Sequence, residues 1–174
     1  VSLGIGPSAA QTPRPNLLLI SSDDHRWDFL GVAGNPKIHT PALDRLAAQG
    51  VYFRQATTPV SQCHPVRATL LTGLAAHQHG AVSNHHSTLT AGQPSPLEKL
   101  ATLPGLLQAA GYRTLLVGKW HLDLEPWRAG FTDVASWIPG SVADYQDPEI
   151  ARGKTRELVK VMGNTQKLLA DDAV

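Results

Sequence analysis

The chain contains one cysteine, Cys63, in the run Cys63-His64-Pro65-Val66-Arg67. With no second cysteine it has no intrachain disulfide partner, and most free cysteines are small buried hydrophobes. Here, however, residues 68–71 suit a helix that begins near Cys63. Free N–H groups and the dipole at a helix N-terminus favour an anionic group. We therefore expect Cys63 to be placed for chemistry or for modification.

Two adjacent carboxylates, Asp23 and Asp24, follow the apolar run of residues 17–20. A short continuous apolar run is typical of a strand buried on both faces. In open α/β sheets the ligand crevice lies outside the carboxyl ends of the strands. A hard cation with oxygen ligands, such as Ca²⁺ or Mg²⁺, would offset the repulsion between the two acids. The alternative interpretation is a solvated turn or a helix N-cap.

Lys119 and His121 follow residues 112–117, which are predicted to form a second buried parallel strand. Residues two positions apart on an extended chain point to the same side. Both side chains are therefore expected at the same sheet edge as the acidic pair. The alternatives are a solvated strand-end lysine and an ordinary packed histidine.

The pattern Cys-x-Pro-x-Arg, continued by Ala-x-Leu-Leu-Thr-Gly, closely resembles the signature of the type I sulfatases, a branch of the alkaline phosphatase superfamily. Further blocks resemble the family in the family's order: residues 14–24, 34–53 and 103–122. The resemblance covers residues 14–170, but only the N-terminal part of a family member. It implies an α/β fold with a mostly parallel, alkaline phosphatase-like sheet flanked by helices and incomplete in this chain.

The resemblance also implies a sulfuric ester hydrolase and assigns its site. Cys63 would be converted to formylglycine by a formylglycine-generating enzyme, and the hydrated aldehyde would attack sulfur. Asp23, Asp24 and the modified residue 63 would bind Ca²⁺, with Mg²⁺ as the alternative. Arg67, Lys119 and His121 would hold the diol and the sulfate ester of a small molecule or carbohydrate. The ligands that complete the metal site lie in segments that this chain lacks, so we expect it to be inactive alone.

Other functions remain open at this stage. Phosphonate monoester and phosphodiester hydrolases share the Cys-x-Pro-x-Arg loop and the acidic pair. A non-catalytic fragment, in which Cys63 stays a thiol, is a second alternative. A thiol-dependent hydrolase is disfavoured because no partner pattern for a cysteine nucleophile is apparent.

Helix signals define the connecting elements. Thr40, Pro41 and Gly50 predict a helix over residues 41–49, followed by a strand that begins at Val51. Thr102 predicts the cap of a short helix that ends at residue 111. A further helix is predicted over residues 155–170, weakened in its middle by Gly163 and Asn164.

Several residues have two interpretations. Four histidines fall close together but lack a zinc spacing, and they are interpreted as pocket rim or loop packing: His77, His79, His85 and His86. His25 is either close to the metal or merely exposed. Asp123, Glu125 and Arg128 either rim the pocket or lie at the surface. The four tryptophans either stack on a sugar or pack in the core.

Composition agrees with a globular α/β protein. The chain has 174 residues, 42% of them hydrophobic and 17% charged, with 15 basic and 14 acidic side chains. There is no basic field for nucleic acid and no apolar run approaching the roughly 20 residues that span a bilayer. Residues 1–13 are interpreted as a leader or signal-peptide remnant, and residues 14–174 as the N-terminal portion of a catalytic domain. A periplasmic or secreted enzyme is expected, with a cytoplasmic location left open.

Overall fold

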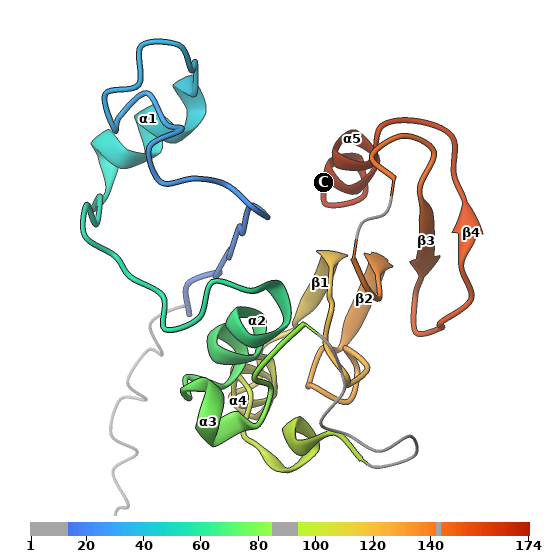
Figure 1. Cartoon of the computed structure of the whole chain (residues 1–174). Coiled ribbons are helices and arrows are strands. Elements are labelled where there is room, and N and C mark those ends of the chain that lie inside the picture. Colours follow the sequence, from blue (N-terminus) through green and yellow to red (C-terminus); the bar gives the residue numbers. More distant parts are fainter. Residues whose placement is uncertain (1–13, 85–93, 142–143) are drawn as a thin grey trace, which may run out of the picture. The chain divides into compact units, whose positions relative to one another are not determined.

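A computed structural model describes residues 14–84, 94–141 and 144–174 (Figure 1). The chain divides into two compact units, Val1–Arg54 and Gln55–Val174. Each unit is described by itself.

The first unit contains α1 (Pro41–Gln49), which confirms the predicted helix and its bounds. Thr40 precedes the helix, but its side chain makes no capping bond to a helix N–H. Instead, Thr40 Oγ1 accepts from the Gly31 N–H (2.8 Å) and donates to Asp44 Oδ1 (3.0 Å). Asp44 Oδ1 also accepts from the Val32 N–H at 2.7 Å. These bonds tie the preceding loop to the first turn of the helix.

The two strands predicted in this unit are not formed. Residues 17–20 and 51–53 have no strand assignment, and their apolar side chains are exposed, with Leu18 at 85% and Val51 at 76%. An apolar run becomes a buried strand only when neighbouring strands satisfy its N–H and C=O groups. Among the described residues no strand pairs with either run. The sequence pattern was therefore correct about apolarity and wrong about burial.

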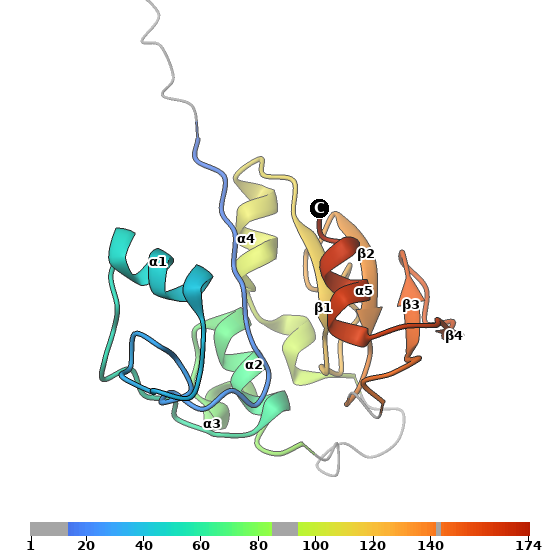
Figure 2. The same cartoon turned by 90° about the horizontal axis from the view of Figure 1, so that it is seen from above.

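The helices of the second unit gather beside one another. They are α2 (Cys63–Thr72), α3 (Ala76–His79), the 3₁₀ helix η1 (Pro96–Lys99) and α4 (Leu103–Ala109). Thr102 caps α4 as predicted, since its Oγ1 accepts from the Gly105 N–H, and it also donates to the Ala129 carbonyl at 2.6 Å. In Figures 1 and 2, α2 and α4 lie on the β1 side of the sheet.

The sheet is mixed. Its strands are β1 (Leu115–Lys119), β2 (Asp133–Ile138), β3 (Glu149–Arg152) and β4 (Val159–Lys160), in the order β1-β2-β3-β4. The pair β1–β2 is parallel, whereas β2–β3 and β3–β4 are antiparallel. The predicted parallel strand is thus confirmed as β1, with bounds shifted toward Lys119. The described sheet has one parallel pair, where a mostly parallel sheet was expected.

The helix predicted over residues 155–170 is wrong in its first half. Residues 159–160 form β4, and the helix α5 (Thr165–Asp171) begins only after Asn164. Gly163 adopts φ 128°, and the Asn164 side chain accepts from the Lys167 N–H at 3.2 Å. The helix α5 therefore begins directly after Gly163 and Asn164, the pair that was expected to weaken the middle of a longer helix.

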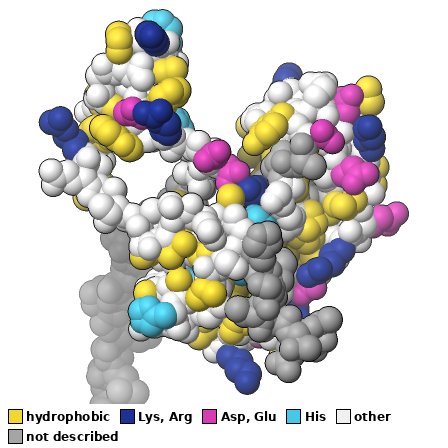
Figure 3. Space-filling model, viewed as in Figure 1, with side chains coloured by type: hydrophobic (Ala, Val, Ile, Leu, Met, Phe, Trp, Pro, Cys, Tyr) yellow, Lys and Arg dark blue, Asp and Glu magenta, His cyan; other side chains and the backbone are white. Residues whose placement is uncertain are grey.

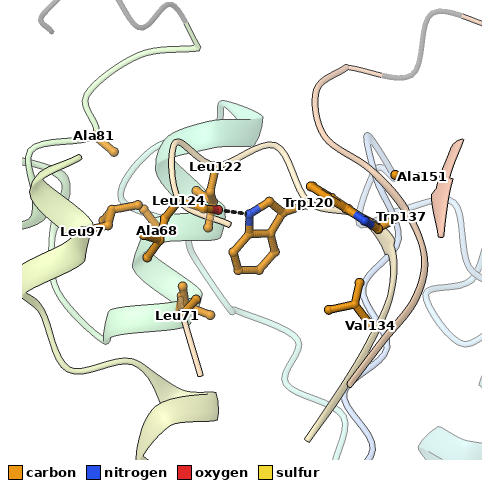
Figure 4. Close-up of a cluster of buried hydrophobic side chains, with 11 residues drawn as sticks. Ala68, Leu71, Ala81, Leu97, Trp120, Leu122, Leu124, Val134, Trp137 and Ala151 are labelled. Carbon is orange, nitrogen blue, oxygen red and sulfur yellow. Dashed lines mark hydrogen bonds between the residues drawn. The ribbon is translucent and has the colours of Figure 1, made fainter. Parts of the chain in front are cut away.

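A cluster of buried side chains joins the helices to the sheet (Figure 4). Trp120 and Trp137 are 5% and 1% exposed, and the Trp120 indole donates to the Leu124 carbonyl. Trp127 packs edge-on against Trp137 with ring centroids 6.0 Å apart. Three of the four tryptophans therefore serve packing, while Trp27 in the first unit is 76% exposed.

The surface carries both charged and apolar side chains (Figure 3). Apolar residues of the first unit are among the most exposed, including Leu46 at 62% and Phe53 at 75%. Across the described ranges no helix is long and apolar enough to cross a membrane.

Candidate active site

Cys63 is the first residue of α2, as predicted, and its side chain is half-buried. Arg67 lies one turn further along the same helix. This placement puts the thiol at the positive end of a ten-residue helix, where an oxyanion is favoured over a neutral group.

The Lys119 side chain lies beside the Cys63 thiol. Its ammonium Nζ lies 3.4 Å from Cys63 Sγ. The Arg67 guanidinium donates to the Lys119 carbonyl at 2.6 Å. Three of the predicted site residues, Cys63, Arg67 and Lys119, are therefore brought together from a helix and a strand that are distant in sequence.

The end of β1 explains how Lys119 arrives there. Between Leu116 and Gly118 the pairing with β2 shifts by one residue, and Gly118 adopts φ 110°, which only glycine takes without strain. Beyond the strand, Trp120 and His121 still bond to the end of β2: their N–H groups donate to the Ile138 and Pro139 carbonyls at 2.9 and 3.0 Å.

His121 is buried at 6% exposure and has φ 52°, an uncommon backbone conformation for a residue that is not glycine. Its ring lies beside that of His64, with centroids 6.1 Å apart and planes tilted by 55°. His121 thus reaches the residue that follows Cys63. Backbone strain of this kind is concentrated at functional sites.

His64 and Asn84 belong to this site although the sequence interpretation did not single them out. The His64 N–H donates to Asn84 Oδ1 at 2.9 Å, and His64 Nδ1 donates to the Ser83 carbonyl at 3.0 Å. His64 Nε2 lies 3.4 Å from Asp123 Oδ2. Asp123 therefore lies next to the site, which was one of its two expected positions. The available signal was a histidine directly after the cysteine at a helix start.

Of the neighbouring histidines that the structure describes, His79 is a packing residue and His77 is not. His79 is fully buried, with Nε2 3.0 Å from Thr69 Oγ1 and Nδ1 accepting from the Ala81 N–H at 3.1 Å. Burial lowers the pKa of His79, with a smaller contribution from His64. His77 is exposed. The predictions for His85 and His86 lie outside the described residues.

Glu125 and Arg128 form a charge network near the surface. Arg128 pairs with Glu98 at 2.8 Å and with Glu125 at 3.6 Å, and Arg156 pairs with Glu125 at 2.8 Å. Both carboxylates are about one-fifth exposed, at 23% and 21% of their side-chain surface. The network links η1 with the loop before Gly130 and with the turn between β3 and β4.

Asp23 and Asp24 belong to the first unit and are exposed there. Asp24 has φ 55°, and His25 bonds within the same loop, to Ser22 Oγ and to the Phe29 carbonyl. Two carboxylates have the donor chemistry that Ca²⁺ takes, but the ion usually needs six to eight oxygens. In the described parts of the chain no three or more acidic, histidine or cysteine side chains gather as a metal site. The two carboxylates thus have the ligand chemistry that Ca²⁺ prefers, but they supply only part of the ligands that the ion needs.

The fold and the site define an α/β domain with a thiol at a helix N-terminus, flanked by lysine and arginine. The sulfatase family model matches residues 15–173. The chain belongs to the sulfatase family. This confirms the resemblance on which the sequence interpretation rested.

Individual relatives of the chain are also named sulfatases. The chain is 37% identical over 145 residues to the N-acetylglucosamine-6-O-sulfatase of Bacteroides thetaiotaomicron, covering 82% of this chain and 24% of that protein. It is 40% identical over 128 residues to human N-acetylgalactosamine-6-sulfatase, covering 71% of this chain and 24% of that protein. The chain therefore spans about a quarter of the length of these curated relatives.

Solved structures show the same fold. BT4656, in complex with its substrate D-glucosamine-2-N,6-O-disulfate, superposes with a TM-score of 0.74 at 30% identity, covering 92% of this chain and 30% of that one. The structure of yidJ from Bacteroides fragilis superposes with a TM-score of 0.66 at 25% identity, covering 92% of this chain and 39% of that one. The alkaline phosphatase-like α/β class is thereby confirmed, and the sheet described here is a part of it.

Proposed function

We propose that this chain is the N-terminal part of a sulfuric ester hydrolase that cleaves sulfate esters with formylglycine, derived from Cys63, as its nucleophile. The observation that carries the proposal is the 3.4 Å contact between Lys119 Nζ and Cys63 Sγ at the N-terminus of α2. Family membership supports the hydrolase class.

The Cys63 thiol stands where the formylglycine oxygens would be, because the aldehyde carbon derives from the Cβ of residue 63. A hydrated aldehyde carries two hydroxyls on that carbon. One attacks sulfur and releases the alcohol. The other then expels sulfate and restores the aldehyde, a step that an ordinary serine ester could not take.

The surrounding side chains stabilise the charge that develops in this reaction. Lys119 binds a sulfate oxygen and His121 donates a proton to the leaving alcohol oxygen. Arg67 holds the Lys119 backbone through the 2.6 Å bond and adds positive charge beside residue 63. Preorganised donors of this kind lower the barrier because they need not reorient during the reaction.

Asp23 and Asp24 are proposed as two ligands of a divalent cation, Ca²⁺ or Mg²⁺, with residue 63 as a third. Their carboxylates are the hard oxygen donors that such ions prefer. When bound, the ion would polarise the sulfate group and lower the pKa of the attacking hydroxyl. The remaining ligands would come from segments beyond the described residues.

The substrate is proposed to be a sulfated carbohydrate. The support is the names of two relatives, which act on N-acetylglucosamine-6-O-sulfate and N-acetylgalactosamine-6-sulfate groups, and the disulfated glucosamine bound by BT4656. An exported enzyme is proposed as well, with residues 1–13 as the remnant of its leader and residues 14–174 as the start of the catalytic domain. The leader lies outside the described residues.

The test is Cys63→Ser in the full-length protein, co-expressed in an aerobic host with a formylglycine-generating enzyme. In the unsubstituted protein, mass spectrometry of the Cys63 peptide should show a mass about 18 Da lower than that of the thiol, the aldehyde of the proposed nucleophile. Cys63→Ser should show no such loss and should release sulfate from N-acetylglucosamine-6-sulfate at least about 10³-fold more slowly.

A matched control is Thr69→Ser, which keeps a hydroxyl on the same helix away from its N-terminus and should retain activity. Full sulfate release by Cys63→Ser would refute the formylglycine mechanism. Hydrolysis of phosphate diesters in place of sulfate esters would instead move the chain to the related phosphodiesterase class.

A further inference from the structure

We propose that Asn84 and Asp123 are positioning residues that fix residue 63 at the N-terminus of α2 by holding His64. The role rests on the hydrolase function proposed above. It concerns side chains that contact the two residues next to Cys63.

Asn84 contacts both residues that flank Cys63, the backbone of His64 and the side chain of Gln62. Gln62, the residue before α2, makes no side-chain cap to its own helix. Instead, Asn84 Oδ1 accepts from the His64 N–H at 2.9 Å, and the Asn84 N–H donates to Gln62 Oε1 at 3.2 Å. Asn84 therefore acts as a helix cap supplied from outside the helix. Residue 63 lies between its two contacts.

Asp123 holds the other end of His64. The His64 side chain is buried at 3% exposure, with Nδ1 bonded to the Ser83 carbonyl at 3.0 Å and Nε2 3.4 Å from Asp123 Oδ2. Asp123 follows His121 by two residues. His64 thus joins the start of α2 to the loop that carries His121, whose ring is 6.1 Å away.

The arrangement matters for rate because the site is assembled from three separate segments. The nucleophile comes from α2, Lys119 and His121 come from the end of β1, and Asn84 comes from the segment after α3. A displacement of about 1 Å at a reacting atom can cost on the order of 10²-fold in rate. His64 belongs to α2, bonds to Ser83 and Asn84, and lies 3.4 Å from Asp123 in the loop after β1, so this buried side chain connects the three segments.

The test compares Asn84→Ala, Asn84→Asp and Asp123→Asn in the full-length protein, with rates divided by the formylglycine content found by mass spectrometry. For Asn84→Ala we expect kcat to fall at least about tenfold with KM within about twofold, since positioning acts on the reacting atoms. Asn84→Asp keeps the accepting oxygen and should recover most of kcat. Asp123→Asn should lower kcat with a smaller effect.

Asn164→Ala is the matched control, because Asn164 also accepts from a helix N–H, that of Lys167 at 3.2 Å, at the start of α5. It should cost comparable stability and leave kcat unchanged. Equal kcat losses in Asn84→Ala and Asn164→Ala, or no loss in Asn84→Ala, would overturn the proposal.

Hydrogen exchange separates this proposal from the proposed function. Asn84→Ala should speed exchange of the His64 amide, and Asn164→Ala should not. If the unsubstituted protein hydrolyses no sulfate ester, the function fails while the exchange result still decides whether Asn84 holds α2. An unchanged His64 exchange rate would refute the positioning role in either case.

Discussion

His79 shows how a histidine beside an active site can be excluded from its chemistry. Its Nδ1 accepts the Ala81 N–H, so the ring proton is on Nε2, which donates to Thr69 Oγ1. A second proton on Nδ1 would break the bond to Ala81 inside a fully buried environment. The side chain is therefore held neutral.

The free energy of unfolding should consequently fall in mild acid. Burial lowers the pKa of His79 below its ordinary value of 6.5. The unfolded chain takes up this proton before the folded chain does, so stability is complete above pH 6.5 and declines as the pH falls toward the lowered pKa. Urea unfolding at a series of pH values between about 7.5 and 5 measures the decline.

Two variants separate the contribution of His79 to this pH dependence from that of other groups. His79→Gln should reduce the pH dependence, while His77→Gln, at an exposed histidine of the same short helix, should leave it as in the unsubstituted protein. An unchanged pH dependence in His79→Gln would contradict the assignment.

For single residues, the sequence predicted the positions that depend on local spacing. Cys63 and Arg67 share one helix, and Lys119 ends one strand, so their motifs locate them. Asn84 and His64 were missed because their role depends on a contact across 20 residues of chain. No local pattern encodes such a contact. Asp23 and Asp24 remain predictions.

At the scale of the elements, the loop at Gly130 packs so closely against α4 that it leaves no room for a side chain. Gly130 has φ 100°, and a Cβ there would overlap the backbone of Gly105 in the first turn of α4. The adjacent Ala129 carbonyl accepts the Thr102 hydroxyl at 2.6 Å. The capping bond and the close backbone approach hold this loop and helix together.

Gly130→Ala should therefore lower the free energy of unfolding by roughly 2–6 kcal/mol, the sum of backbone strain and overpacking. Gly140→Ala is the matched control, because a Cβ at Gly140 meets nothing within 4 Å. The control should change stability by less than about 0.5 kcal/mol. Urea unfolding of both variants measures the two losses of stability. Equal losses in Gly130→Ala and Gly140→Ala would refute the close approach of the Gly130 loop to α4.

Elements with their own end signals were predicted well, whereas of the strands, which depend on pairing partners, only β1 was confirmed. Pro41 and Thr102 marked the starts of α1 and α4 closely. Residues 17–20 and 51–53 have the apolarity of strands but no paired strand among the described residues. Residues 159–160 joined a hairpin with β3, a non-local pairing that overrides helical periodicity.

At the scale of the whole molecule, the chain spans 24% of the length of the relatives described above. The described residues include the loop of the proposed nucleophile and the cations beside it, but no cluster of three metal-ligating side chains. A divalent cation with only two or three protein ligands would be held weakly. Among the described residues, the proposed metal site therefore has only part of its ligands.

We expect the 174-residue chain alone to release sulfate at least about 10³-fold more slowly than the full-length protein, because charge stabilisation at sulfur would be incomplete. Sulfate release at matched formylglycine content measures the difference. Comparable rates would show that the described residues suffice and would contradict the proposed metal ligation.

The exposed run at residues 17–20 has a consequence for biosynthesis. Its four apolar side chains are 63–85% exposed, and the ribosome delivers them well before β1 and β2. During much of translation the nascent chain would carry an exposed apolar segment with unpaired backbone groups. We expect such a segment to favour aggregation unless a holdase chaperone covers it. Expression yield should therefore depend on chaperone supply more than on the folded stability of the Gln55–Val174 unit.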